Sequence, residues 1–192
     1  MRVSASGIIA TLLAEAVVAP LVWLLVVPRM DWSARQKPPP VEQALATNVL
    51  TRWIRRNAVS RTNPLSPTPD NLKEAQAEYE EHCAACHGLD GGGSNRFEAQ
   101  FYPPVAKLTG GVRKLSDSDI YFIVANGIRY TAMPAFEGTH SPDDIWRMVL
   151  WVRHLTYLTA DERAAIVSDM RSRMRDHGET MQHGPSADAN TE

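Results

Sequence analysis

The order of apolar and polar residues divides the 192-residue chain into one continuous apolar stretch followed by amphipathic segments. Residues 7–27 are apolar apart from Thr11, Glu15 and Pro20, and a stretch of this length suffices to cross a hydrocarbon core, which takes about 20 residues. Further along, apolar residues recur at intervals of three and four, which predicts helices. The predicted helices cover residues 41–57, 68–87, 116–128, 141–155 and 159–175.

Helix-capping residues precede most of these segments. A Ser or Thr followed by Pro or by acidic residues is typical of a helix start, and this pattern begins at Thr68, Ser116 and Ser141. Thr159 and Glu162 form a further capping box. Residues from 177 onward are polar and predicted to be disordered. Residues 90–95, with three consecutive glycines, are predicted to form a flexible loop.

Charge changes sign along the chain. Residues 29–71 hold seven basic and three acidic side chains, whereas residues 72–157 hold eight basic and eleven acidic ones. The helix at 41–57 follows a stiff proline run and carries Arg52, Arg55 and Arg56 near its end. It is suited to anionic lipid headgroups, to its own acidic domain or to a partner, and the sequence leaves these three open. With a net charge of −2, the chain is not expected to bind nucleic acid.

Both cysteines of the chain lie three residues apart, in Cys83-Ala84-Ala85-Cys86-His87-Gly88. A C-x-x-C pair is a redox dithiol, half of a zinc site or, when His follows, an attachment site for c-type haem. A structural zinc site takes about four ligands, and there is no second cysteine pair. A thioredoxin-like dithiol follows a strand, and nothing strand-like precedes Cys83. The motif therefore favours haem.

The predicted helix gives this motif a suitable geometry. Cys83 and Cys86 are three residues apart and His87 is four residues after Cys83, so all three share one helix face. Two sulfurs on that face are placed to bond the vinyl groups of one porphyrin, with the imidazole beneath its iron. Gly88 allows the helix to end and the chain to turn away.

Haem iron that carries electrons takes a sixth ligand, and the Met thioether is the usual one where a raised potential is needed. Of the seven methionines, Met133 lies on a predicted loop before Pro134, 46 residues after His87, which is enough chain to reach the other face of the ring. Met148 falls within an amphipathic helix and is predicted to pack in the core. His140 and His154 are the alternative sixth ligands.

Residues 68–157 resemble a class I cytochrome c domain. The resemblance is carried by the CAACHG motif, Tyr102-Pro103-Pro104, Asn126-Gly127-Ile128 before Met133-Pro134-Ala135-Phe136, and Trp146 on the final helix. It implies an all-α fold around one covalent haem c. It also implies that Cys83 and Cys86 are thioether anchors, that His87 is the proximal ligand and that Met133 is the distal ligand.

The resemblance further implies that a backbone carbonyl near Pro103 or Pro104 orients the His87 ring. Arg129 and Tyr130 lie beside the ligand loop and are candidates for binding a haem propionate, although a solvent-facing position is equally expected. The family often carries Gly eight residues before the first Cys, where the first and last helices cross. Ala75 at this position predicts a slightly wider crossing.

The apolar stretch favours an uncleaved membrane anchor over a cleaved signal, because no small-x-small site follows Val27 and no further Cys is available for lipidation. Attachment of c-type haem takes place outside the bacterial cytoplasm, so the resemblance implies a haem domain on the periplasmic side of the inner membrane. Glu15 is unfavourable in lipid. It is expected either to face a partner helix or to mark the point before which the embedded stretch begins.

The expected organisation is an anchor (1–28), a basic linker (29–67), a haem domain (68–157) and a C-terminal helix with a polar tail (158–192). The expected function is electron transfer between redox proteins in or at the membrane, as in a respiratory chain. No catalytic triad or carboxylate pair at a convincing spacing indicates an enzyme. The alternatives are a haem subunit of a larger respiratory, dehydrogenase or photosynthetic complex, and a haem peroxidase or gas sensor with an open sixth position.

Overall fold

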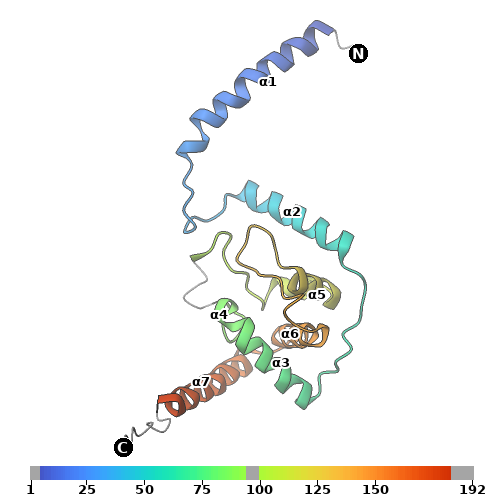
Figure 1. Cartoon of the computed structure of the whole chain (residues 1–192), viewed down its shortest axis with the longest axis vertical. Coiled ribbons are helices and arrows are strands. Elements are labelled where there is room, and N and C mark those ends of the chain that lie inside the picture. The colour runs from blue at the N-terminus through green and yellow to red at the C-terminus, as the bar shows by residue number, and fades with distance from the viewer. Residues whose placement is uncertain (1–4, 94–99, 183–192) are drawn as a thin grey trace, which may run out of the picture. The chain divides into compact units, whose positions relative to one another are not determined.

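The computed structural model describes residues 5–93 and 100–182 of the chain. Helices dominate these residues, which contain no strand, and the predicted all-α fold is confirmed (Figure 1). In chain order the elements are α1 (Ala5–Leu25), η1 (Val27–Arg29), α2 (Pro40–Asn57), α3 (Pro69–His82), α4 (Ala84–His87), η3 (Gly111–Lys114), α5 (Asp117–Asn126), α6 (Pro142–Leu155) and α7 (Ala160–Gln182).

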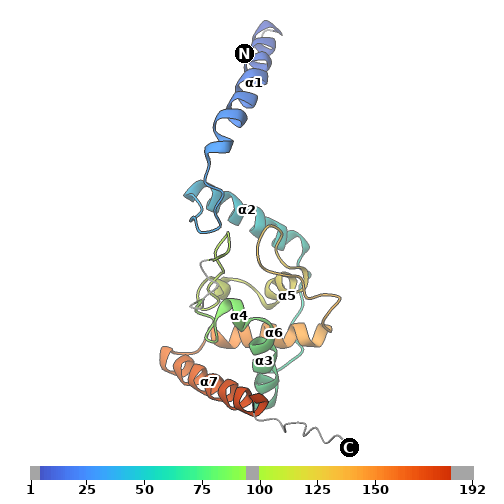
Figure 2. The ribbon, with the colours of Figure 1, turned by 60° about the vertical axis from the view of Figure 1, so that its left-hand side comes forward.

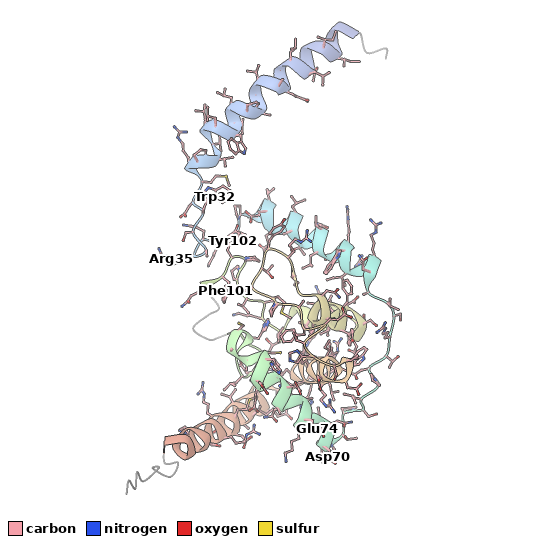
Figure 3. The ribbon with its side chains drawn as sticks, in the orientation of Figure 1. Trp32, Arg35, Asp70, Glu74, Phe101 and Tyr102 are labelled. Carbon is pink, nitrogen blue, oxygen red and sulfur yellow. The ribbon has the colours of Figure 1, made fainter. Side chains whose placement is uncertain are left out.

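The chain divides into two compact units, Met1–Gln36 and Lys37–Glu192, and each is considered by itself. In the first unit, α1 continues past Pro20, and its apolar side chains are exposed. Within the described residues, Thr11–Arg29 is the one helical stretch that is long and apolar enough to cross a membrane. After η1 the indole nitrogen of Trp32, labelled in Figure 3, donates to the carbonyl of Val27 at 3.2 Å.

The core of the second unit lies where α3 packs against α6 (Figure 1). Ala75 on α3 has no exposed surface, and on α6 neither Met148 nor Val149 has any. The predicted core position of Met148 is therefore confirmed. The crossing of these helices accommodates the Ala75 methyl group, and α5 packs against the same helix α6.

The predicted helix starts are confirmed by their capping hydrogen bonds. Thr68, Ser116 and Ser141 each use a side-chain oxygen to accept from the backbone N–H three residues later, at 3.3, 3.1 and 3.2 Å. The last two are full capping boxes, because the acidic side chain at the third helical position bonds back to the cap backbone. Thr159 and Glu162 form the same reciprocal pair.

Helix α7 is longer than predicted and belongs to the core. It reaches Gln182, so the predicted helix end near residue 175 is wrong, and so is disorder beginning at residue 177. A polar sequence does not by itself indicate disorder, because Glu and Gln are good helix formers and a single Gly lowers helix stability by only about 1 kcal/mol. Met170 is fully buried, and Arg173 pairs with Glu80 of α3 at 2.7 Å.

Helix α2 confirms the helix predicted at 41–57 and packs against α5 (Figure 2). The ring centroids of Trp53 and Phe122 are 4.6 Å apart, and Ile54 is buried. Tyr102, labelled in Figure 3, donates its hydroxyl to the Glu42 carboxylate at 2.5 Å. One face of this basic helix therefore lies on its own domain.

The segment after α2 is also fixed to the domain. The backbone N–H of Arg61 donates to the Ser118 hydroxyl at 2.8 Å, and that hydroxyl donates to the Arg61 carbonyl at 2.7 Å. Further on, the Asn63 side chain donates to the carbonyl of Trp146 at 3.1 Å. Residues 58–65 thus form part of the folded unit. They lead from α2 toward α3 and are held on the way by hydrogen bonds to α5 and α6.

Candidate functional site

The CAACHG motif lies at a bend between two helices, and the prediction of one continuous helix over residues 68–87 is wrong. Helix α3 ends at His82, Cys83 has φ −113° and ψ −38°, and α4 begins at Ala84. The carbonyl of Cys83 accepts from the N–H groups of both Cys86 (3.1 Å) and His87 (2.9 Å). Such shared bonds are common at helix ends. The turn that presents the two cysteines and the histidine is nevertheless closed by hydrogen bonds.

The two thiols are not bonded to each other. Cys83 is half-buried against the core. Burial, supplemented by the nearby Glu78 carboxylate and Cys86, raises the pKa of Cys83 to about 12. A redox-active dithiol needs a lowered pKa, so this environment does not suit thiol exchange.

The imidazole of His87 is oriented by a backbone carbonyl. Its Nδ1 lies 2.9 Å from the Ala106 oxygen, and because a carbonyl only accepts, Nδ1 carries the proton. Burial lowers the pKa of His87, and the bond to Ala106 partly opposes this. Nε2 makes no hydrogen bond to any described residue. A neutral imidazole with Nδ1–H fixed and Nε2 free is the form that ligates a metal.

The orienting carbonyl lies near Pro104, as predicted. It belongs to Ala106, two residues beyond Pro104, and both Pro103 and Pro104 are exposed. The prolines restrict the path of the loop, but which carbonyl meets the ring depends on the loop's tertiary position, which sequence spacing does not determine. No signal in the sequence distinguishes Ala106 from its neighbours.

A packed turn follows the motif where a flexible loop was predicted. Gly91 is buried at φ 71°, and a Cβ there would lie 3.2 Å from Leu155 and 3.3 Å from Leu108. The Gly91 carbonyl accepts from Leu108 N–H at 2.8 Å, and Gly93 N–H donates to the His87 carbonyl at 2.9 Å. The prediction of flexibility is wrong for 90–93, because Gly91 is packed against Leu155 and Leu108 and backbone hydrogen bonds hold the turn. Residues 94 and 95 lie outside the described residues.

The Met133 loop is held against the end of α5. Gly127 has φ 65°, and a Cβ added to it would lie 2.7 Å from the Pro134 carbonyl carbon and 2.8 Å from the Met133 oxygen. The N–H of Phe136 donates to the carbonyl of Val124 at 3.2 Å. Met133 itself is half-buried against the core. The Asn-Gly-Ile segment is therefore needed for close backbone approach, which fixes the loop that carries the thioether.

The remaining predicted site residues are less enclosed. Arg129 is exposed, and Tyr130 is 89% exposed at φ 61°, with no hydrogen bond from either side chain to a described residue. His140 uses Nδ1 toward Thr139 (2.9 Å) and Nε2 toward His82 (3.2 Å). His154 stacks beside Trp151, and burial lowers its pKa. Both ring nitrogens of His140, one of the two alternative sixth ligands, therefore already have partners.

The donor set fits a covalently bound haem. Two cysteines one turn apart, a neutral imidazole with a free Nε2 and a thioether on a fixed loop are the groups that such a cofactor uses. Among the described residues no group of three or more His, Cys, Asp and Glu is suited to hold a separate metal ion.

A comparison with protein families agrees with this interpretation. A family model described as cytochrome C oxidase, cbb3-type, subunit III matches residues 70–152. A solved structure from Kuenenia stuttgartiensis, a reducing HAO-like protein complex, has 28% sequence identity to this chain and a TM-score of 0.42. That match covers 50% of this chain and 50% of the other, so this chain spans about half the length of the chain it matches. No curated protein matches the chain.

The segment matched by the family model contains the CAACHG motif, the Ala106 carbonyl, the Met133 loop and the helices that hold them in place. Together with the all-α fold, this match shows that residues 70–152 of the chain are a class I c-type cytochrome domain.

Proposed function

We propose that this chain is a membrane-anchored electron carrier with one haem c, attached through Cys83 and Cys86 and ligated by His87 and Met133. The observation that carries the proposal is the His87 ring, whose Nδ1 donates to Ala106 at 2.9 Å while Nε2 has no partner among the described residues. An imidazole fixed in this tautomer is prepared to bind iron and is more basic because of its carbonyl partner.

Haem c, when bound, supplies a one-electron iron couple whose potential depends on the axial ligands and their surroundings. The chain's own residues hold and orient it. The Cys83 carbonyl closes the turn that presents both sulfurs and the imidazole. On the Met133 side, the backbone N–H of Met133 donates to the Thr131 hydroxyl at 3.1 Å, and Gly127 allows the loop to lie close to α5.

Three further residues belong to the proposed haem environment by their position. Pro104 lies two residues before the orienting carbonyl of Ala106. Arg129 and Tyr130 lie between the end of α5 and Met133, with side chains at the surface. A guanidinium in this position is available to a propionate, while the high exposure of Tyr130 favours contact with solvent.

The proposed location is the bacterial inner membrane, with the haem domain on the periplasmic side. The apolar stretch Thr11–Arg29 supports a single membrane span. The cytochrome domain supports the extracytoplasmic side, because c-type haem is attached there. The proposed partners are redox proteins in or at the same membrane, and the chain acts as a carrier, not as an enzyme by itself.

A second candidate function is a permanent haem subunit of a larger redox complex. The observation that favours it is the family model, which is described as a subunit of an oxidase. Extraction in mild detergent separates the two. A free carrier migrates as a species of 21.3 kDa plus detergent, whereas a subunit co-migrates with other chains through successive columns.

The absorption spectrum of the oxidised holoprotein tests the proposed ligand set. Met-ligated c haem has a weak thioether-to-iron band near the red end of the visible spectrum. We expect this band in the parent protein, its loss in Met133→Ala and its retention in the control Met148→Leu, which changes a buried methionine of α6. Absence of the band in the parent, or its persistence in Met133→Ala, overturns the assignment of Met133. The first result would favour the open sixth position of a peroxidase or gas sensor.

A further inference from the structure

One face of α2 turns away from the domain and carries apolar side chains and arginines in a single stripe. Val41, Leu45, Val49, Arg52 and Arg56 follow one another at helical spacings of four and three. The three apolar side chains are 81%, 65% and 60% exposed, and both arginines are exposed as well. Because Trp53 and Ile54 face α5, this stripe, called the outer face of α2, has no partner within the described residues.

The charge of the outer face is not neutralised. Arg52 and Arg56 of this face, and the neighbouring Arg55 of α2, make no ion pair or hydrogen bond with a described residue. The one acidic residue of α2 is Glu42, which is engaged by the Tyr102 hydroxyl at 2.5 Å. Exposed valine and leucine beside uncompensated arginines are typical of helices that lie in the headgroup region of a membrane, with the apolar side chains at the acyl boundary.

The chain also limits how far α2 can be from a membrane. The candidate membrane span ends at Arg29 and α2 begins at Pro40, so residues 30–39 join them. A fully extended chain of this length reaches roughly 35 Å. Such a short connection keeps α2 at a high effective concentration near the bilayer surface, so that even weak binding to lipid is favoured.

We propose that the outer face of α2 docks onto anionic phospholipid headgroups of the membrane that holds the anchor. The arginines pair with lipid phosphates, for which a guanidinium is well suited, and Val41, Leu45 and Val49 enter the headgroup layer. This inference rests on the membrane anchoring in the proposed function. Because the opposite face of α2 is fixed on α5, docking also fixes the orientation of the cytochrome domain on the membrane.

A nitroxide probe on the outer face tests the docking. Asn48 is exposed and lies on the outer side of α2, where its side chain bonds only locally to the Ala44 carbonyl. The full-length holoprotein carrying Asn48→Cys, labelled with nitroxide, is reconstituted in nanodiscs of phosphatidylcholine alone or mixed with phosphatidylglycerol. Collision with a water-soluble nickel complex then reports the exposure of the label. Lys73→Cys on the exposed side of α3 is the matched control position.

We expect the Asn48 label to become less accessible to nickel in anionic nanodiscs but not in neutral ones, and to become accessible again in high salt. The Lys73 label should stay accessible under all these conditions. Replacing Arg52, Arg55 and Arg56 by Glu should lower the ratio of docked to undocked protein by about a hundred-fold or more, since each arginine near an anionic surface contributes about five-fold. The control with Lys73, Lys114 and Arg171 replaced by Glu, three exposed charges elsewhere, should leave this ratio unchanged.

The contrary results are distinct. An accessible Asn48 label in anionic discs overturns the docking while leaving the anchor intact, since the protein still co-purifies with the disc. Equal protection in neutral discs overturns the role of charge, and protection that depends on protein concentration without lipid assigns the face to a second copy or another protein. Failure of haem attachment is recognised separately, because nitroxide then labels Cys83 and Cys86 in the parent chain.

Discussion

The hydroxyl of Tyr79 donates a hydrogen bond of 2.6 Å to the carbonyl of Gly88, and so connects α3 to the residue that follows the CAACH turn. Both residues are buried, and burial raises the pKa of Tyr79, so the hydroxyl stays protonated and remains a donor. This bond ties the residue that ends α4 to helix α3.

Tyr79→Phe should therefore lower the free energy of unfolding by about 1–3 kcal/mol, because the Gly88 carbonyl is left buried without its donor. Guanidinium unfolding of the holoprotein measures the change. The matched control is Tyr121→Phe, whose hydroxyl makes no hydrogen bond to a described residue although its ring contacts Trp146. Equal stability of the two variants would show that the Tyr79 bond contributes nothing.

The position of Gly127 predicts a larger loss of stability than that of Tyr79→Phe, together with a change in the loop that carries Met133. Its φ of 65° and ψ of −172° fall in a region that is essentially restricted to glycine, and an added Cβ would also meet the Met133–Ala135 backbone. Gly127→Ala should therefore destabilise the protein by about 3 kcal/mol or more, as strain and overpacking combine. It should also weaken the red absorption band that the proposed Met133 ligation would produce.

Gly138→Ala serves as the control, because Gly138 also has a positive φ (92°) but has open space around the missing Cβ. We expect it to cost about 1–2 kcal/mol from backbone conformation alone and to leave the band intact. If Gly127→Ala behaves no differently from Gly138→Ala, the close approach of the loop to α5 is not needed for its position.

The α3–α6 crossing predicts that enlarging two nearby alanines of α3 will change the stability of the protein by different amounts. Ala75 is fully buried at the crossing, whereas Ala77 is exposed on the same helix. Ala75→Leu should destabilise by about 1–3 kcal/mol through overpacking, and Ala77→Leu should change stability by no more than about 0.5 kcal/mol. Thermal unfolding of the two variants decides this, and a stable Ala75→Leu protein would mean that the helices separate easily.

Asp144 predicts a pH dependence. Hydrogen bonds from Ser141, aided by Arg147, lower the pKa of this carboxyl below its usual value. A lowered pKa in the folded state means that the stabilisation is present above the unfolded pKa, about 3.9, and is lost as the pH falls through the folded value. Asp144→Asn should cost about 0.5–1 kcal/mol near neutral pH and progressively less in acid below about pH 4.

Asp143→Asn is the control for Asp144, because the Asp143 carboxylate makes no hydrogen bond to a described residue. Denaturant unfolding of both variants across this pH range gives the comparison. A deficit of Asp144→Asn that stays constant down to acid pH would show that the carboxylate charge is not the stabilising feature.

Local signals in the sequence predicted the helices and their starts well. Thr68, Ser116 and Ser141 carry their own capping groups, so the position of each helix start is encoded within a few residues. The motif itself also indicated where the cysteines and His87 come together. These features depend on hydrogen bonds between residues that are close in the chain.

The features that were missed depend on distant contacts. The packed turn at Gly91 depends on residues from another part of the chain, because Leu155 and Leu108 lie against it. The packing of α7 against the domain likewise depends on Met170 entering a core formed by other helices. A periodic pattern shows that a face is apolar but does not show what it contacts.

The hydrogen bonds of Arg61 with Ser118, and of Asn63 with Trp146, have a consequence for how the chain delivers electrons. They fix the segment after α2, and Trp53 packs α2 on Phe122, so both are part of the folded unit. In the proposed membrane-anchored carrier, the flexible connection to the cytochrome domain is therefore confined to the residues before α2. The length of residues 30–39 therefore limits how far the cytochrome domain can lie from the proposed anchor. Inserting or deleting residues within 30–39 should alter which redox partners the carrier can meet while leaving its haem site and its potential unchanged.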